Sequence, residues 1–211
     1  GYMPTLDGYP NIYVQEYPTL YEGLVSDVDW HIDASFLTKP LKGAVLYSLD
    51  VPKVGGDTTW VNLYEAYELL SKPMQKLCSS LTAVHDNFHK NLINVLNTYG
   101  AQGYEMARKA TPPNEHPLVC RHPETEKKCL FYSELMISHF KELTNEENDN
   151  LKEFLNNHIK KPELGCRFKW ENNSIAFWDN RCTAHKGIFD FGQSYRLMHR
   201  VAIQGETRPK Q

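Results

Sequence analysis

The sequence predicts a mainly β protein of jelly-roll type, with two or three helices outside its sheets. Most regular segments are short runs of apolar and β-branched residues, separated by glycine, proline and other turn residues. Only two or three segments have the apolar spacing of a helix, and strands do not alternate with helices as in a doubly wound α/β sheet. Many short strands with few helices are typical of a sandwich or barrel.

The N-terminal third predicts strands joined by loops. The first thirty residues are rich in Tyr, Pro, Gly and Asp, which predicts loops around one short strand at 11–15. Apolar runs predict further strands at 29–36 and 43–51. Gly55-Gly56-Asp57 predicts a turn, and residues 58–61 continue from it as another strand.

The next segment predicts two short helices and then an irregular excursion. Asn62 is suited to cap a helix, with Glu65 three residues later as its capping partner. Pro73 fits the first turn of a second helix better than the middle of one. Residues 86–115 have weak periodicity, two glycines and two consecutive prolines. We therefore expect them to form a mobile excursion rather than a second domain.

The second half predicts a hairpin, one helix and three strands. Segments 116–121 and 128–133 flank a turn and read as a hairpin. Thr144 and Glu147 form a capping-box pattern that opens a helix, and Pro162 and Gly165 end it. Strands are expected at 166–171, 174–179 and 195–204, and Ile175 and Phe177 of the second strand are expected to lie in the core.

Composition excludes several classes of protein. Apolar residues make up 41% of the 211 residues and charged residues 23%, which predicts one soluble globular domain over residues 1–211. Lys and Arg number 23 against 26 Asp and Glu, and this net charge of -3 does not favour nucleic acid as a partner. No apolar run approaches the roughly 20 residues that span a bilayer, so we expect no membrane partner. Assembly into a homo-oligomer stays open.

Cysteine usage favours a reducing compartment. The five cysteines are an odd number, and no two have C-x-x-C spacing, so neither a disulfide framework nor a zinc ribbon is expected. The sequence therefore predicts a cytoplasmic protein. The first residues form neither a signal peptide nor a basic leader, although the abrupt start leaves room for a missing N-terminal segment.

Three residues are candidate ligands of one metal ion. His31 and Asp33 lie two apart in a predicted strand, so their side chains are expected on the same face. An imidazole and a carboxylate are two thirds of the facial triad that binds ferrous iron. His185, just after a predicted strand, is the best candidate for the third ligand. The alternatives are a solvated surface pair at His31 and Asp33, and packing of His185 against Phe189 or Phe191.

Two arginines near the C-terminus are candidate anion ligands. Arg196 and Arg200 share one face of the last predicted strand with Met198. A buried guanidinium needs an anionic partner, and its planar fork suits a carboxylate or sulfonate. No carboxylate-rich segment is an obvious partner for them. The alternative is an exposed strand face.

Taken together, these motifs resemble the taurine dioxygenase family. The resemblance rests on the order and spacing of the motifs and runs from about Tyr9 to Arg208. The motifs are Trp30-His31-x-Asp33, Gly55-Gly56-Asp57-Thr58-x-Trp60, Trp178-Asp179-Asn180-Arg181-x-Thr183-x-His185 and Arg196-x-Met198-His199-Arg200. Members of this family are iron(II)- and 2-oxoglutarate-dependent oxygenases on a double-stranded β-helix. The resemblance implies a small anionic substrate, O2 as co-substrate, and release of succinate and CO2.

The resemblance also implies a role for each site residue. His31, Asp33 and His185 correspond to the Fe2+ ligands and so to the catalytic residues. Thr58 and Arg196 correspond to the residues that hold the distal carboxylate of 2-oxoglutarate. The substrate-binding positions are Arg200, which corresponds to the residue for the anionic head of a sulfonate such as taurine, and Ala34 and Met136, where this chain departs from the usual residues.

Further departures concern the substrate pocket. Family members normally have a longer segment before the H-x-D motif, so part of the family's N-terminal segment is expected to be missing here. Segment 86–115 corresponds to the region that caps the active site, and residues 86–110 do not match it position by position. Alternative functions are oxidation of alkyl sulfates or aryloxyacetates, an inactive jelly-roll binding protein, or a zinc hydrolase that uses the same triad.

Overall fold

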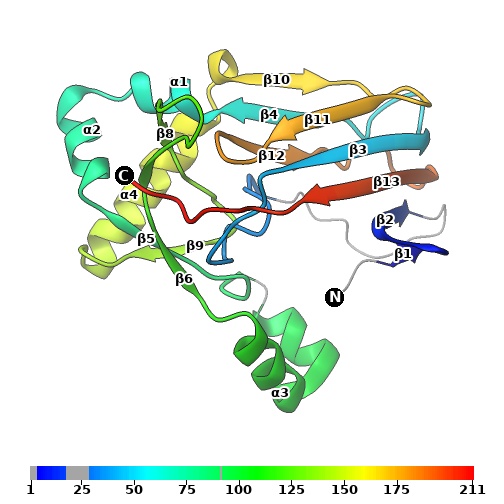
Figure 1. The fold of residues 1–211 in the computed structure, drawn as a ribbon, viewed down its shortest axis with the longest axis horizontal. Coiled ribbons are helices and arrows are strands. Elements are labelled where there is room, and N and C mark those ends of the chain that lie inside the picture. The colour runs from blue at the N-terminus through cyan, green and yellow to red at the C-terminus, as the bar shows by residue number, and fades with distance from the viewer. Residues whose placement is uncertain (1–3, 18–28, 91) are drawn as a thin grey trace.

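Two antiparallel sheets lie in the right-hand part of Figure 1 and form the framework of the molecule. The computed structural model describes residues 4–17, 29–90 and 92–211. The larger sheet has the strand order β1 (Thr5–Leu6), β2 (Tyr9–Tyr17), β13 (Arg196–Ile203), β3 (Gly43–Asp50) and β11 (Ile175–Asp179). The smaller sheet has the order β10 (Gly165–Phe168), β4 (Thr58–Asn62) and β12 (Thr183–Gly187).

The two sheets pack through an aromatic core. Alternate side chains of β3 are buried, as the period of a strand requires. They pack with Trp60 of β4, Trp178 of β11 and Met198 of β13 in one cluster, so residues from both sheets meet in the same layer. The centroids of the Trp60 and Trp178 rings are 5.4 Å apart. Burying one large apolar side chain stabilises the fold by roughly 1.5–3 kcal/mol, so this layer fixes the two sheets against each other.

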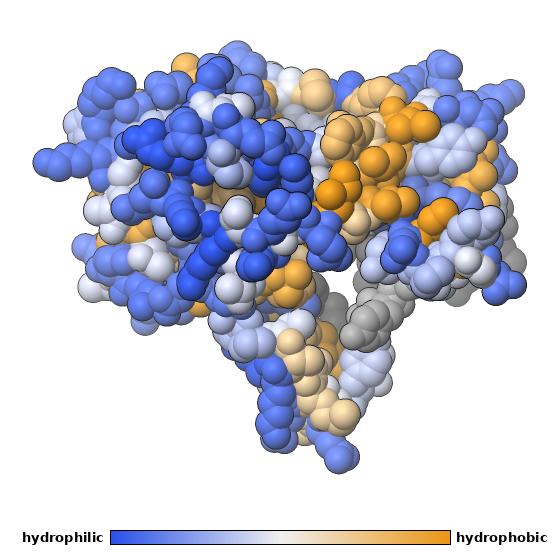
Figure 2. Space-filling model, in the orientation of Figure 1, coloured by the Kyte–Doolittle hydropathy of each residue, from blue (hydrophilic) through white to orange (hydrophobic). Residues whose placement is uncertain are grey.

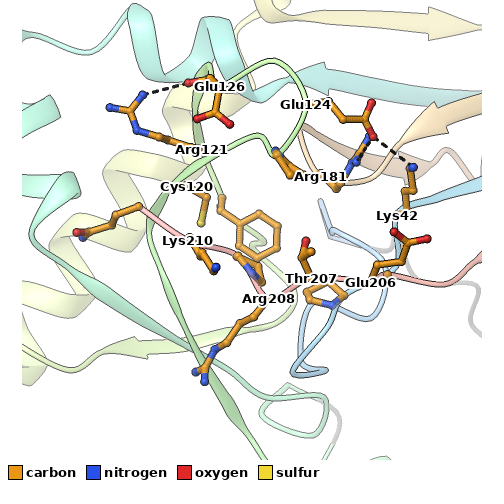
Figure 3. Close-up of a pocket in the computed structure, with 16 residues that line it drawn as sticks. Lys42, Cys120, Arg121, Glu124, Glu126, Arg181, Glu206, Thr207, Arg208 and Lys210 are labelled. Atoms are coloured by element: carbon orange, nitrogen blue, oxygen red, sulfur yellow. Dashed lines mark hydrogen bonds and ion pairs between the residues drawn. The ribbon is translucent and has the colours of Figure 1, made fainter.

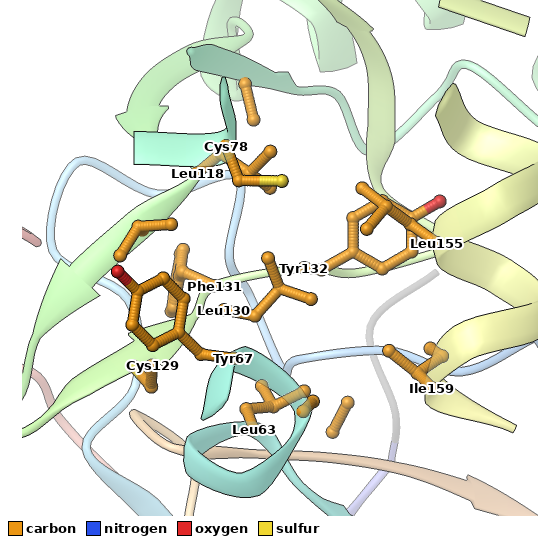
Figure 4. Packing of buried hydrophobic residues seen from close by; sticks show 14 of the residues in the cluster. Leu63, Tyr67, Cys78, Leu118, Cys129, Leu130, Phe131, Tyr132, Leu155 and Ile159 are labelled. Carbon is orange, nitrogen blue, oxygen red and sulfur yellow. The ribbon is translucent and has the colours of Figure 1, made fainter. Parts of the chain in front are cut away.

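A second core lies under the helices, in the left-hand part of the molecule. Its sheets are β6 (Asn114–Pro117), β5 (Thr82–His85) and β9 (Ile137–Phe140), in that order, and the pair β7 (Val119–Arg121) and β8 (Lys128–Leu130). The helices are α1 (Leu63–Glu68), α2 (Lys72–Ser79), α4 (Asn145–Ile159) and the 3-10 turn η1 (Pro162–Leu164). Figure 4 shows Leu63 and Tyr67 of α1 beside the β7–β8 pair, with Leu155 and Ile159 of α4 closing the cluster. Mainly β structure with helices at the side confirms the predicted jelly-roll class.

The predicted helix caps are confirmed. The Asn62 side chain accepts hydrogen bonds from the backbone N–H groups of Tyr64 and Glu65. Thr144 and Glu147 form a complete capping box at the start of α4. Pro73 lies in the first turn of α2. These features depend on contacts within four residues, which is why the sequence alone predicts them.

The strand predicted at 29–36 is wrong. Only His31 pairs, in an isolated antiparallel bridge with His185, and residues 33–36 form a turn in which Ala34 has a φ of 49°. The physical reason lies in Asn180, whose side chain binds both the N–H and the C=O of Asp33. These backbone groups are therefore satisfied by a side chain and not by a neighbouring strand.

The segment 86–115 is more regular than the sequence predicts. It contains α3 (Leu92–Ala110), interrupted at Gly100, where φ is 68° and ψ is 178°. Figures 1 and 2 show α3 projecting away from the sheets. Ile93, Tyr99 and Met106 are 72%, 54% and 68% exposed, so α3 does not bury these apolar residues in a core. Because an apolar pattern with helical spacing reflects a buried face, this helix shows only a weak one.

Three smaller expectations also need correction. Residues 116 and 117 belong to β6, so the predicted hairpin is reduced to β7 and β8. β12 was not predicted as a strand. Ile175 and Phe177 of β11, expected in the core, are 63% and 68% exposed. Figure 2 shows apolar side chains gathered on the surface in the region where β11 lies in Figure 1. Among the described residues, no helix is both long and apolar enough to cross a bilayer.

Candidate active site

A cavity of about 330 Å³ opens between the two sheets. Its walls come from β2, β3, β4, β11, β12 and β13 and from the turn that follows His31. His31, Asp33, His185, Arg196 and Arg200 all line it. Five residues that sequence analysis singled out separately are therefore brought together in one place.

The three candidate metal ligands converge in this cavity. His31 Nε2 lies 3.8 Å from Asp33 Oδ1, and His185 Nε2 lies 3.6 Å from Asp33 Oδ2. The two imidazole centroids are 4.2 Å apart. Reciprocal backbone hydrogen bonds of 2.9 Å between His31 and His185 hold the two residues side by side. One potential ligand atom from each residue lies within 4.8 Å of the others, a spacing that one ion can bridge.

The protonation of the triad suits a metal ion. His31 Nδ1 lies 3.0 Å from the carbonyl oxygen of Asp29, which can only accept, so Nδ1 carries a proton and Nε2 is the nitrogen that faces Asp33. Burial is the largest influence on His185 and lowers its pKa to about 3, so that imidazole is neutral near pH 7. Burial alone would raise the pKa of Asp33, but His185, the Arg200 guanidinium and His31 together hold it below its usual value. Two imidazoles and one carboxylate fit a divalent transition metal.

Arg200 lies against a metal-ligand candidate. Its Nη2 atom is 2.5 Å from Asp33 Oδ2, and both side chains are largely buried. Arg200 therefore has a carboxylate partner inside the protein, although it also borders the cavity. A guanidinium carries five N–H donors, so one contact with Asp33 leaves others for an anion in the cavity.

Arg196 is in a different situation. It is 6% exposed, and its guanidinium lies 5.8 Å from the ring centroid of Tyr17 and 5.9 Å from that of Phe191. Its hydrogen bond to the Gly56 carbonyl oxygen is long, at 3.4 Å, and its Nε has no partner among the described residues. Within residues 4–17, 29–90 and 92–211, no carboxylate pairs with it. A buried cation of this kind is suited to an anionic ligand.

Thr58 lies at the start of β4 on the same cavity wall. It is 3% exposed, and its Oγ1 accepts a hydrogen bond of 3.0 Å from Trp170 Nε1. The indole N–H can only donate, so the hydroxyl hydrogen of Thr58 remains available for another acceptor. The neighbouring Gly56 has a φ of 73°, and a Cβ there would lie 3.4 Å from Arg196 Nε. The backbone at Gly56 can therefore approach Arg196 closely.

The two remaining predicted site residues, Met136 and Ala34, differ in their position relative to the cavity. Met136 lines it and is 9% exposed. Ala34 is not among the lining residues; it occupies the turn after Asp33 with a left-handed φ of 49°.

Four residues that support this site are not singled out by the sequence. Tyr17 and Phe191 enclose Arg196, Trp170 binds Thr58, and Asn180 binds Asp33. Asn180 lies inside the motif from Trp178 to His185, and this position is a signal in the sequence that could have identified it. Tyr17 is far from Arg196 along the chain, and Phe191, although closer, lies outside any helix or strand. No local sequence pattern therefore points to either residue.

A second group of potential ligands is already hydrogen-bonded. His122, Asp179 and Cys182 also lie close enough to hold an ion. However, His122 Nδ1 accepts the backbone N–H groups of Glu124 and Thr125, and its Nε2 lies 3.0 Å from Asp179 Oδ2. The same carboxylate receives two hydrogen bonds from the Arg181 side chain. These groups form a closed network that explains their proximity without a metal.

A larger cavity, of about 430 Å³, lies elsewhere in the protein (Figure 3). It is bounded by the C-terminal segment and the turn between β7 and β8, and it shares no lining residue with the first. Glu124 on its rim pairs with Lys42 at 3.2 Å and with Arg181 at 2.8 Å. None of its lining residues is a buried arginine like Arg196, which has no carboxylate partner among the described residues.

Comparison with known proteins gives consistent matches over most of the chain. Residues 2–202 match the model of the family described as "Taurine catabolism dioxygenase TauD, TfdA family". An alkylsulfatase from Acinetobacter baylyi is 31% identical over 192 residues, which cover 84% of this chain and 57% of that protein. An alpha-ketoglutarate-dependent sulfonate dioxygenase from Saccharomyces cerevisiae is 30% identical and covers 91% of this chain and 46% of its own length.

Solved structures share the fold. The crystal structure of a taurine dioxygenase from Burkholderia xenovorans superimposes with a TM-score of 0.79 at 32% identity, over 97% of this chain and 67% of that one. This likeness confirms the jelly-roll fold. The chain spans about half the length of the curated relatives it matches.

Proposed function

Since the chain belongs to the TauD/TfdA family of dioxygenases, we propose that it is an iron(II)- and 2-oxoglutarate-dependent dioxygenase. Its substrate would be a small anion, with a sulfonate such as taurine as the first choice. The sulfonate dioxygenase of S. cerevisiae and the alkylsulfatase of A. baylyi support this class and make alkyl sulfates the second choice. Aryloxyacetates are the third, because a relative from Cupriavidus pinatubonensis is named for 2,4-dichlorophenoxyacetate.

One observation carries the proposal: a triad of two imidazoles and a carboxylate shares its cavity with a buried guanidinium that has no carboxylate partner among the described residues. His31, Asp33 and His185 would bind the iron. Arg196 and Thr58 would bind the distal carboxylate of 2-oxoglutarate, since one supplies charge and the other a free hydroxyl hydrogen. A zinc hydrolase would have no use for the cation, and a binding protein that lost activity would have no reason to keep the triad.

The chemistry that bound iron and 2-oxoglutarate supply is oxidative decarboxylation, in which O2, 2-oxoglutarate and a C–H bond give succinate, CO2 and a C–OH group. The protein itself binds and aligns. Arg200 would hold the anionic head of the substrate while remaining paired with Asp33. The distance from that head then determines which carbon faces the metal. Trp178 and Phe191 on the cavity wall exclude water.

The same proposal covers the organisation of the chain. Residues 1–211 would form a single oxygenase domain, and segment 86–115 a mobile cap at the active site. The Asp86 N–H donates to the carbonyl oxygen of Met136, a cavity residue, at 2.7 Å, which attaches the base of that segment beside the site. A cytoplasmic location is supported by five free cysteines.

Succinate release tests the function. Purified protein with Fe2+, O2 and 2-oxoglutarate is given sulfonates, alkyl sulfates and aryloxyacetates, and succinate is measured for each. We expect substrate-dependent succinate from at least one class. His31→Ala should abolish it, whereas His139→Ala, at an exposed histidine of β9, should not.

Two results would reject the proposal. Equal succinate production by the wild type and His31→Ala would show that the triad is not the metal site. Hydrolysis of an ester by the Zn2+ form, without any use of 2-oxoglutarate, would identify a hydrolase instead.

A further inference from the structure

Asn180 is a fully buried amide in the turn between β11 and β12. Its side chain is 0% exposed and makes three hydrogen bonds. Oδ1 accepts the backbone N–H of Asp33 at 2.9 Å. Nδ2 donates to the carbonyl oxygens of Asp33 at 2.9 Å and of Leu41 at 3.0 Å. The amide therefore holds the backbone on both sides of the Asp33 side chain.

Asp33 depends on these bonds because it lies outside any strand. The turn that begins at Asp33 includes Ala34 with a φ of 49°, a conformation that costs a residue with a side chain about 1 kcal/mol or more. Without Asn180, the N–H and C=O of Asp33 would be buried with no partner, and the turn could relax. The direction of the carboxylate is set by this backbone.

Asn180 is itself well anchored. Its backbone N–H donates to the carbonyl oxygen of Lys42 at 3.0 Å, just before β3 begins. It also lies between β11 and β12, which carries His185. One amide therefore links the turn that presents Asp33 to the strand pair that presents His185.

We propose that Asn180 is a positioning residue for the metal site, which fixes the Asp33 carboxylate against the two imidazoles. The inference rests on the proposed function, because it needs Asp33 to be a metal ligand. Groups that hydrogen-bond and orient a metal ligand typically change metal affinity by 10- to 100-fold when they are replaced, and Asn180 would act on Asp33 through its backbone.

The competing explanation is that Asn180 only stabilises the fold, and the chain offers a matched control. Asn148 of α4 is also a buried amide, 4% exposed. Its side chain accepts the Phe140 N–H and donates to the carbonyl oxygens of Phe140, Leu143 and Thr144. It lines neither cavity, so it measures the cost of losing a buried amide without the metal site.

The experiment compares Asn180→Ala with Asn148→Ala. Metal-free protein is titrated with Mn2+ alone by calorimetry, and the melting temperature is recorded for each variant. Both variants should melt at lower temperature than the wild type. We expect the Mn2+ affinity of Asn180→Ala to fall by 10- to 100-fold and that of Asn148→Ala to change by less than about twofold. Asn180→Ser, with Asn148→Ser beside it, serves if the alanine variants do not fold.

The outcomes separate the inference from the proposed function. If Asn180→Ala or Asn180→Ser folds and binds Mn2+ like the wild type, or if both Asn148 and Asn180 variants lose affinity equally, the inference is overturned. It is also overturned if no Asn180 variant folds while the Asn148 variants do, because Asn180 is then a residue of the core. If wild type and His31→Ala bind Mn2+ with the same affinity, the metal site itself, and with it the proposed function, fails.

Discussion

Arg196 is a buried cation whose counter-charge does not come from the described part of the protein. Burial lowers its pKa, and the nearby Tyr17 acts in the opposite direction. A buried charge without a partner costs free energy, so the folded protein retains it at the expense of stability. Such a cost is reasonable where a ligand supplies the missing charge.

Replacing Arg196 with Met should therefore separate binding from stability. Arg196→Met keeps a long apolar side chain between Tyr17 and Phe191 but removes the charge. We expect the affinity for 2-oxoglutarate to fall by about 2–5 kcal/mol, while the ligand-free protein melts no lower than the wild type. Calorimetric titration and thermal melting measure the two effects. Arg121→Met, at an exposed arginine, should change neither, and unaltered 2-oxoglutarate affinity in Arg196→Met would remove Arg196 from the site.

The hydrogen bond from Trp170 to Thr58 gives a second prediction at the residue scale. Trp170→Phe removes the indole N–H but keeps a ring beside Phe168, whose centroid is 4.9 Å from that of Trp170. Losing the bond should weaken 2-oxoglutarate binding by on the order of 1 kcal/mol, about fivefold. In a Thr58→Val background the same change should have no further effect, because the hydroxyl is absent. Equal effects of Trp170→Phe in both backgrounds would mean that the tryptophan acts through packing.

At the scale of elements, the end of β11 is tied to the β7–β8 turn by an ionic network. Burial alone would raise the pKa of Asp179, but hydrogen bonds from Arg181 and His122 lower it to about 2. A carboxyl whose pKa is lower in the folded state stabilises the fold above its unfolded pKa of about 4. That contribution is lost as the pH falls from about 4 to 2.

Asp179→Asn tests this network. The wild type should melt at higher temperature than Asp179→Asn at pH 5 to 6, and the difference should shrink as the pH falls toward 2. Thermal melts across this pH range measure it. Asp149→Asn, at an exposed residue of α4, controls for the loss of one negative charge. A difference that stays constant down to pH 2 would contradict the assigned ionic role.

The separation of interacting residues along the chain explains which elements the sequence could predict. The caps at Asn62 and Thr144 involve neighbours a few residues away, so they were predicted correctly. The turn at Asp33 depends on Asn180, which is 147 residues distant, and a local pattern cannot contain that partner. The convergence of His31 with His185 likewise depends on long-range pairing, and the resemblance of ordered motifs suggested it where periodicity could not.

At the scale of the whole molecule, the site lies where two sheets meet, and each sheet contributes part of it. β12 of the smaller sheet supplies His185, and β13 of the larger sheet supplies Arg196 and Arg200. The core of Trp60, Trp178 and Met198 fixes the distance between these strands. Ligands that bridge both sheets should therefore stabilise the entire fold.

This coupling predicts the response of the melting temperature to ligands. Mn2+ is used in place of Fe2+ so that 2-oxoglutarate binds without turnover. Mn2+ accepts the same nitrogen and carboxylate ligands as Fe2+. At 100 times its dissociation constant, a ligand that binds only the folded state adds about 2.7 kcal/mol, and for a chain of this size we expect the melting temperature to rise by about 5–10 °C. Arg196→Met should keep the rise that Mn2+ alone produces but lose the increment from 2-oxoglutarate, whereas His31→Ala should lose the Mn2+ response. If Mn2+ raised the melting temperature of His31→Ala as much as that of the wild type, the ion would be binding elsewhere. The cavity between the two sheets would then not be the metal site.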